Sequence, residues 1–137
     1  IWHGHYASYF EDARVAFAKL YGITYQQLDA EGLKTPVKQL HVDYHAPLLF
    51  DHDYSITAGL FWNEAARMDM EYVIRDMEGN VKARGYTVQM FTSLEGPLCF
   101  AKPAFYDNFC SRWVAGNLPD LAKTYMGEPS VSRVHYS

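Results

Sequence analysis

The hydrophobic period of the chain changes once, after Pro36, and this change limits the folds that the sequence can adopt. Between residues 6 and 20, apolar residues recur at steps of three and four, the spacing of a helix with one buried face, and Gly22 ends the pattern. A shorter helix is expected over residues 24–30, with Thr24 as its N-cap. Beyond Pro36, apolar and polar residues alternate, which predicts half-buried strands at 38–44, 54–62, 68–74 and 81–92.

The turns between these elements indicate how they meet. Residues 76–80 contain Gly79 and join the last two strands, so we expect an antiparallel hairpin there. Gly85 interrupts the final strand, and we expect it to mark the place where the long helix approaches the sheet. A helix followed by several antiparallel strands predicts an α+β fold in which helix packs against sheet.

One domain is expected for residues 1–137, because 49% of the residues are hydrophobic and no linker or repeat divides the chain. Residues 97–137 are rich in proline and contain short helical patterns such as 104–113, so we expect a C-terminal extension that wraps the surface or a partner subunit. The chain begins with Ile1 rather than Met, and nearly inside a helical pattern. We therefore expect that residues preceding Ile1, a first strand among them, are missing here.

The composition disfavours several classes of function. The formal net charge is −4 at pH 7, so no basic field exists to bind nucleic acid or an anionic membrane. Cys99 and Cys110 fit neither a CxxC metal pattern nor a disulfide framework, which indicates a reduced, cytoplasmic protein. No run approaches the roughly 18 apolar residues of a membrane span, and no histidine spacing suits a metal site, so neither a metal nor a bound cofactor is expected.

The residues that suggest chemistry stand where the chain enters the long helix. Trp2-His3-Gly4-His5-Tyr6 is a polar, glycine-containing turn that leads directly into the helical pattern. The first turn of a helix has free backbone N–H groups and the positive end of the helix dipole. Such donors stabilise the negative charge that forms on a carbonyl oxygen when a thioester is attacked.

At these residues the chain resembles the 4-hydroxybenzoyl-CoA thioesterase-like (YbgC-type) branch of the hotdog superfamily. The signature of that branch combines an Asp, a turn that contains Gly, the motif Tyr-His-Ala-Asn-Tyr and a Glu-x-Ala-Arg helix. Here Trp2-His3-Gly4-His5-Tyr6 and Glu11-Asp12-Ala13-Arg14 match it. Val42-Asp43-Tyr44-His45-Ala46-Pro47 with Asp51, and Ala83-Arg84-Gly85-Tyr86-Thr87, extend the resemblance over residues 1–96.

The resemblance implies a hotdog fold, in which an antiparallel β-sheet wraps a long central helix, and hydrolysis of acyl-CoA. The catalytic Asp of the family falls upstream of Ile1. The resemblance assigns catalytic roles to His3, Gly4 and His5: His3 orients that Asp or hydrogen-bonds the thioester, and the backbone N–H groups bind the oxyanion. His5 replaces the Asn of the family, and Tyr6 is placed with the substrate-binding residues.

Four more residues have both a functional and a structural interpretation. Glu11 is a base or nucleophile, or it forms an ion pair with Arg14 one helical turn later. Asp51 shapes the substrate entrance, or it only forms a turn. Lys82 and Arg84 receive the phosphates of coenzyme A, or they are solvated charges on a strand face.

The predicted function is hydrolysis of an acyl-CoA thioester to a free acid and CoA. Two alternatives stay open: a hotdog hydratase or dehydratase, and a non-catalytic module that binds acyl-CoA. A sheet of this kind leaves an edge strand open, and pairing of two edges across a two-fold axis removes that edge. We therefore expect a homodimer or a dimer of dimers with active sites at the subunit interface.

Overall fold

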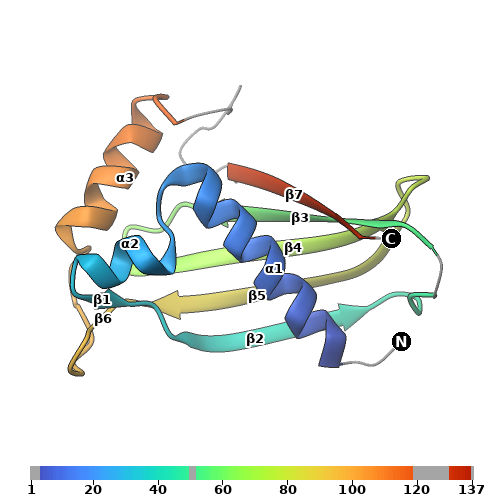
Figure 1. Cartoon of the computed structure of the whole chain (residues 1–137), viewed down its shortest axis with the longest axis horizontal. Helices are drawn as coiled ribbons and strands as arrows, with labels where there is room; N and C mark the ends of the chain where they lie inside the picture. Colours follow the sequence, from blue (N-terminus) through green and yellow to red (C-terminus); the bar gives the residue numbers. More distant parts are fainter. Residues whose placement is uncertain (1–3, 50–51, 119–129, 137) are drawn as a thin grey trace.

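The computed structural model describes residues 4–49, 52–118 and 130–136 (Figure 1). Three helices lie within these ranges: α1 (Gly4–Tyr21), α2 (Tyr25–Ala30) and α3 (Ala104–Val114). The strands in the same ranges are β1 (Leu33–Lys34), β2 (Val37–Tyr44), β3 (Tyr54–Phe61), β4 (Arg67–Asp76), β5 (Val81–Met90), β6 (Thr92–Ser93) and β7 (Ser130–Tyr136). In this part of the chain, five strands form an antiparallel sheet in the order β2-β5-β4-β3-β7, and β1 pairs with β6.

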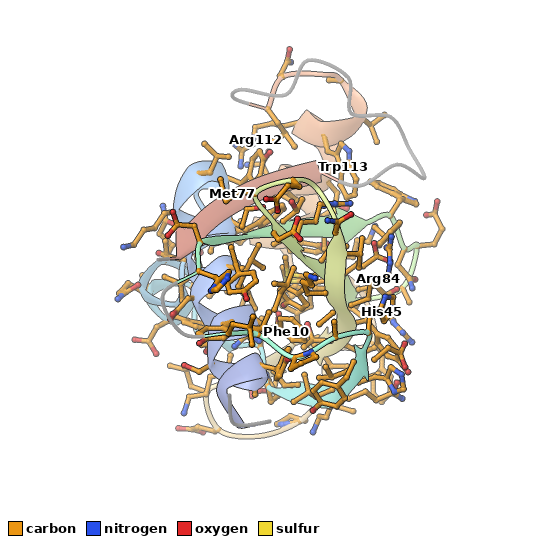
Figure 2. The ribbon with its side chains drawn as sticks, turned by 90° about the vertical axis from the view of Figure 1, so that its right-hand side faces the viewer. Phe10, His45, Met77, Arg84, Arg112 and Trp113 are labelled. Atoms are coloured by element: carbon orange, nitrogen blue, oxygen red, sulfur yellow. The ribbon has the colours of Figure 1, made fainter. Side chains whose placement is uncertain are left out.

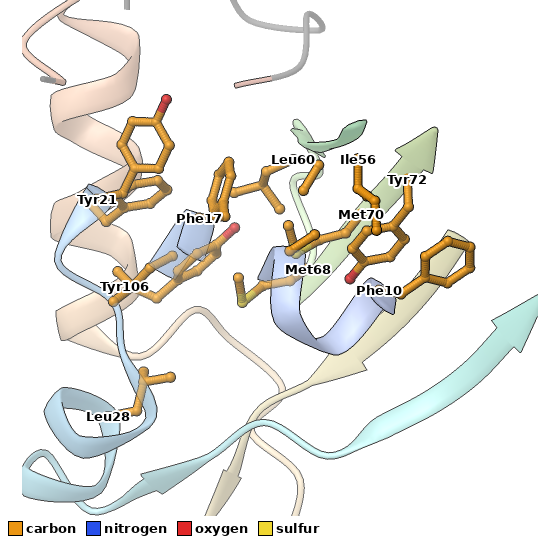
Figure 3. Packing of buried hydrophobic residues seen from close by; sticks show 14 of the residues in the cluster. Phe10, Phe17, Tyr21, Leu28, Ile56, Leu60, Met68, Met70, Tyr72 and Tyr106 are labelled. Carbon is orange, nitrogen blue, oxygen red and sulfur yellow. The ribbon is translucent and has the colours of Figure 1, made fainter. Parts of the chain in front are cut away.

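The α1 helix lies across one face of the five-stranded sheet (Figure 1). Phe10, Ala13 and Phe17 form its buried stripe, each no more than 1% exposed. They meet the alternate residues of β3 and β4 that face the helix, among them Ile56, Leu60, Met68, Met70 and Tyr72 (Figure 3). The expected α+β arrangement of one long helix against an antiparallel sheet is confirmed.

Local sequence signals determine the turns as expected. Thr24 and Gln27 form a capping box at the start of α2, and Gly32 follows that helix with a φ of 74°. In the β4–β5 hairpin, the Asp76 carboxylate accepts hydrogen bonds from the backbone N–H groups of Glu78 (3.0 Å) and Asn80 (2.8 Å). Gly79, with a φ of 92°, supplies the left-handed residue that this loop needs.

The fourth predicted strand is longer in the sequence pattern than in the structure. We expected one strand over residues 81–92, but β5 ends at Met90. Phe91 is fully buried, and Thr92 and Ser93 then pair with Lys34 and Leu33 in the separate β1–β6 ladder. The chain therefore changes its strand partner at Phe91, from β2 and β4 to β1.

The C-terminal region supplies a helix and an edge strand. The α3 helix buries Tyr106, Phe109, Cys110 and Trp113, which confirms the helical pattern at 104–113. The β7 strand pairs with β3 and extends the sheet, an element that the sequence did not predict. None of the helices in the described ranges is both long and apolar enough to cross a membrane.

Gly85 lies where α1 comes closest to β5, as expected. A Cβ atom built on Gly85 would approach the ring of Phe10 and lie 2.6 Å from the backbone oxygen of His41. The Phe10 ring also stacks on Tyr72, with ring centroids 4.7 Å apart. The absence of a side chain at position 85 therefore allows Phe10 to reach the sheet.

The substitution Gly85→Ala is predicted to destabilise the fold by about 3 kcal/mol or more, because backbone and ring must both shift. Urea denaturation of both proteins measures the loss. The control Tyr86→Ala changes an exposed neighbour on the same strand and should cost less than about 1 kcal/mol. Equal stability of Gly85→Ala and the unmodified protein would contradict this packing.

Candidate functional site

The start of α1 is the place where the sequence predicts chemistry. Gly4 and His5 occupy its first turn, and His3 lies outside the described residues. Tyr6 is 2% exposed, and its ring meets Tyr44 at the end of β2 edge-on, with centroids 4.8 Å apart. Burial is the largest cause that raises the pKa of Tyr6. The helix start therefore lies beside the C-terminal end of the β2 edge strand.

Glu11 and Arg14 form an ion pair one turn apart on α1, in agreement with the structural interpretation of Glu11. The Tyr25 hydroxyl donates a hydrogen bond to Glu11 Oε2 (3.3 Å), and the Arg14 guanidinium lies 5.3 Å from the centre of the Tyr25 ring. Burial is the first cause that raises the pKa of Tyr25. These contacts connect α1 with the start of α2.

Beside this trio lies a small, partly enclosed space, which we call the inner recess. It has room for about 20 Å³. Residues of α1, β4, β5 and the α2 region line it, among them Arg14, Tyr25, Thr35 and Gln89. The Gln89 side-chain amide donates to the backbone oxygen of Thr35 (2.8 Å) and to its hydroxyl (3.2 Å).

A larger pocket, which we call the α2 groove, shares Tyr25 and Thr35 with the inner recess. Its volume is about 690 Å³. It lies between α2, β1 and β6, and its lining comprises Tyr25, Gln26, Asp29, Leu33, Lys34, Thr35, Pro36 and Thr92. Pro36 directly precedes β2, so the groove lies at the opposite end of that strand from the start of α1 (Figure 1).

The two cations expected to bind coenzyme A are both paired with carboxylates. Arg84 is on the side away from α1 (Figure 2), and its guanidinium lies 3.7 Å from the Glu71 carboxylate. Lys82 lies 3.6 Å from the carboxylate of Asp76. Each cation therefore faces a carboxylate, and Arg84 lies on the sheet face opposite to α1. Asp51 lies outside the described residues.

Sequence reasoning missed the polar residues of the core beneath α1. Thr87 and Gln89 follow Ala83 and Gly85 on the same face of β5, at positions where strand alternation predicts apolar residues. Both are buried. The Tyr72 and Thr87 hydroxyls are hydrogen-bonded to each other at 2.8 Å. The signal available in the sequence was this pair of polar residues on the buried face of a strand.

Comparisons with known proteins agree with the fold. The family model of the thioesterase-like superfamily matches residues 3–113. Among curated proteins, none matches the sequence.

Solved structures of thioesterases resemble the chain. DHNA-CoA thioesterase from Staphylococcus aureus is 22% identical, with a TM-score of 0.75 over 92% of this chain and 87% of that one. A 1,4-dihydroxy-2-naphthoyl-CoA thioesterase from Synechocystis is 16% identical, with a TM-score of 0.71 over 81% and 82%. A thioesterase complexed with coenzyme A and Zn from Thermus thermophilus is 20% identical, with a TM-score of 0.63 over 85% and 81%. These likenesses show the hotdog fold, as expected from the sequence.

The ionisation of Tyr72 makes the stability of the fold depend on pH. Burial raises its pKa from 10.0 to about 12, although the hydrogen bond with Thr87 acts in the opposite direction. Above the ordinary pKa the unfolded chain loses this proton while the folded chain keeps it. The stabilising contribution of neutral Tyr72 is therefore complete below about pH 10 and disappears as the pH rises through about 12.

The variant Tyr72→Phe should lose about 1–2 kcal/mol at pH 8, because Thr87 loses its partner. Between pH 10 and 12, however, its stability should fall less steeply, by up to about 1.4 kcal/mol per pH unit. Urea unfolding of both proteins at several pH values in this range measures the two slopes. Parallel slopes would contradict the raised pKa of Tyr72.

Proposed function

The chain belongs to the thioesterase-like superfamily, and from this membership we propose that it hydrolyses acyl-CoA thioesters to a free acid and CoA. The match over residues 3–113 carries the proposal. The structural neighbours from Staphylococcus aureus and Synechocystis are a DHNA-CoA thioesterase and a 1,4-dihydroxy-2-naphthoyl-CoA thioesterase, and the Thermus thermophilus structure contains coenzyme A. These neighbours support coenzyme A as the carrier of the acyl group.

In the proposed mechanism, the thioester carbonyl lies at the start of α1. Water attacks the carbonyl carbon, the C–S bond breaks, and CoA leaves as the thiol after it receives a proton. Backbone N–H groups of Gly4 and His5 stabilise the oxyanion, an interaction of about 3 kcal/mol in comparable sites. An aspartate upstream of Ile1 activates the water or attacks the carbonyl, and His3 positions it. The proposal requires no metal or bound cofactor.

We further propose that β2 pairs with β2 of a second copy, so that the protein is a homodimer. Among the described strands, β2 has its partner β5 on one side only, and it exposes Leu40 (50%), Tyr44 (47%) and Val37 (43%). Edge strands that expose apolar residues are sites of strand pairing. An antiparallel pair of β2 strands places the end of one beside the beginning of the other. The start of α1 in one protomer then faces the α2 groove of its partner.

The variant His3→Ala is predicted to lower kcat/KM about a hundredfold without a loss of stability, because His3 acts on the reacting groups. The assay measures the thiol released from short, long and aromatic acyl-CoAs by the natural full-length protein. His41→Ala is the matched control, because His41 pairs with Asp43 (2.9 Å) on the sheet face away from α1. Full activity of His3→Ala would contradict the proposed site.

The same set of acyl-CoAs distinguishes thioester hydrolysis from the two alternative functions. Binding of acyl-CoA without release of thiol favours a non-catalytic module. Addition of water to an enoyl-CoA, without thiol release, favours a hydratase.

The variant Leu40→Asp is predicted to be a folded monomer with little thioesterase activity, because a charge on the exposed edge opposes strand pairing. Light scattering after size-exclusion chromatography gives the mass, and circular dichroism verifies the fold. Asp43→Ala, on the outer face of the same strand, should keep the dimer. An active monomer would contradict an active site shared between protomers.

A further inference from the structure

Three buried polar atoms without a hydrogen-bond partner among the described residues belong to Arg14 and Gln89, two residues that line the inner recess. Gln89 is 1% exposed, and its Oε1 accepts no hydrogen bond from the described part of the chain. Arg14 Nε and Nη1 are also buried and donate no hydrogen bond to the described part of the chain, although Arg14 Nη2 pairs with Glu11. Buried polar groups are nearly always hydrogen-bonded, since an unmet donor or acceptor costs about 1–3 kcal/mol. Two donors and one acceptor that share a single recess therefore point to a ligand atom.

The chemistry of these atoms limits what they can bind. The Arg14 N–H groups need an acceptor, and Gln89 Oε1 needs a donor. A hydroxyl group is both, because its oxygen accepts while its proton is donated. A carboxylate would pair with Arg14 but offers no proton to Gln89. The recess has room for about 20 Å³, which accommodates one oxygen atom with its proton, as for a single water molecule.

The recess and the α2 groove are neighbours that share two lining residues. Tyr25 and Thr35 line both spaces. Tyr25 is 42% exposed, and its ring can turn aside when it gives up the hydrogen bond to Glu11 and the contact with Arg14. The groove volume of about 690 Å³ is in the range of small-molecule sites, and Leu33, Pro36 and the Tyr25 ring give it apolar walls. With the Tyr25 ring turned aside, the end of an apolar chain in the groove would meet Arg14 and Gln89.

We propose that the α2 groove receives the acyl group of the substrate and that the inner recess selects acyl groups with a hydroxyl near the far end. This inference rests on the proposed thioesterase function and on the proposed dimer. In that dimer the thioester lies at the α1 start of one protomer, opposite the groove of the other. The hydroxyl accepts from Arg14 and donates to Gln89 Oε1, and it replaces a water molecule held there in the free protein.

The test compares acyl-CoAs that differ only in one hydroxyl: 4-hydroxyphenylacetyl-CoA with phenylacetyl-CoA, and 8-hydroxyoctanoyl-CoA with octanoyl-CoA. Thiol release gives kcat/KM, and calorimetry with the matching non-hydrolysable thioethers gives Kd. In the unmodified protein, the hydroxylated member of at least one pair should be favoured about tenfold or more. Gln89→Leu should bring this ratio close to one. Ser55→Ala, which changes a buried polar residue on β3, should leave it unchanged.

The inference would be overturned if, in both pairs, the kcat/KM values of the compounds with and without the hydroxyl differed by less than about twofold. A ratio that persists in Gln89→Leu would also overturn it. If Gln89→Leu does not fold, Arg14→Lys, which keeps the charge beside Glu11 but removes Nε and Nη1, should also reduce the ratio. If no thioester is hydrolysed, the proposed function fails, while the Kd ratio of the thioethers still tests the recess.

Discussion

Phe10 stacks on Tyr72, with ring centroids 4.7 Å apart, and fills the space above Gly85. This contact determines how closely α1 approaches the sheet, because any side chain at position 85 would meet the Phe10 ring and the backbone of His41. The depth of α1 in turn brings Arg14 down to the level of Gln89 and places Tyr6 against Tyr44. Both the helix start and the inner recess therefore depend on one glycine in β5.

The same helix has two kinds of neighbour in the core. Around Phe10 and Phe17 the contacts are apolar, whereas the region near Arg14 contains Thr35 and Gln89. Buried polar groups are less favourable than apolar packing unless each is hydrogen-bonded. Stability alone would favour an apolar residue at position 89, since Leu or Met fills a similar volume. A ligand that completes the hydrogen bonds of Arg14 and Gln89 gives these residues a reason to be polar.

The sequence was sufficient for the main elements, because a helix stripe and strand alternation have different periods. Gly85 was informative because a glycine within a strand often marks a close approach. The Glu11–Arg14 pair followed from helical spacing.

The end of β5 at Met90 was missed because pairing with β1 is a tertiary contact with no local signal. The inner recess was missed for a similar reason: Thr35 and Gln89 are far apart in the chain and meet only in the fold. The β7 strand likewise depends on its pairing with β3.

In the proposed dimer, the helix start of one copy and the α2 groove of the other together form one complete site. Mixing two inactive variants tests this central claim directly. One is His3→Ala, and the other is Gln26→Trp, which fills the groove from the exposed side of α2. After unfolding and refolding together, thioesterase activity should return to about a quarter of that of the unmodified protein, because half of the dimers are mixed and each has one intact site. No recovery in a mixture that contains mixed dimers would contradict a site shared between two protomers.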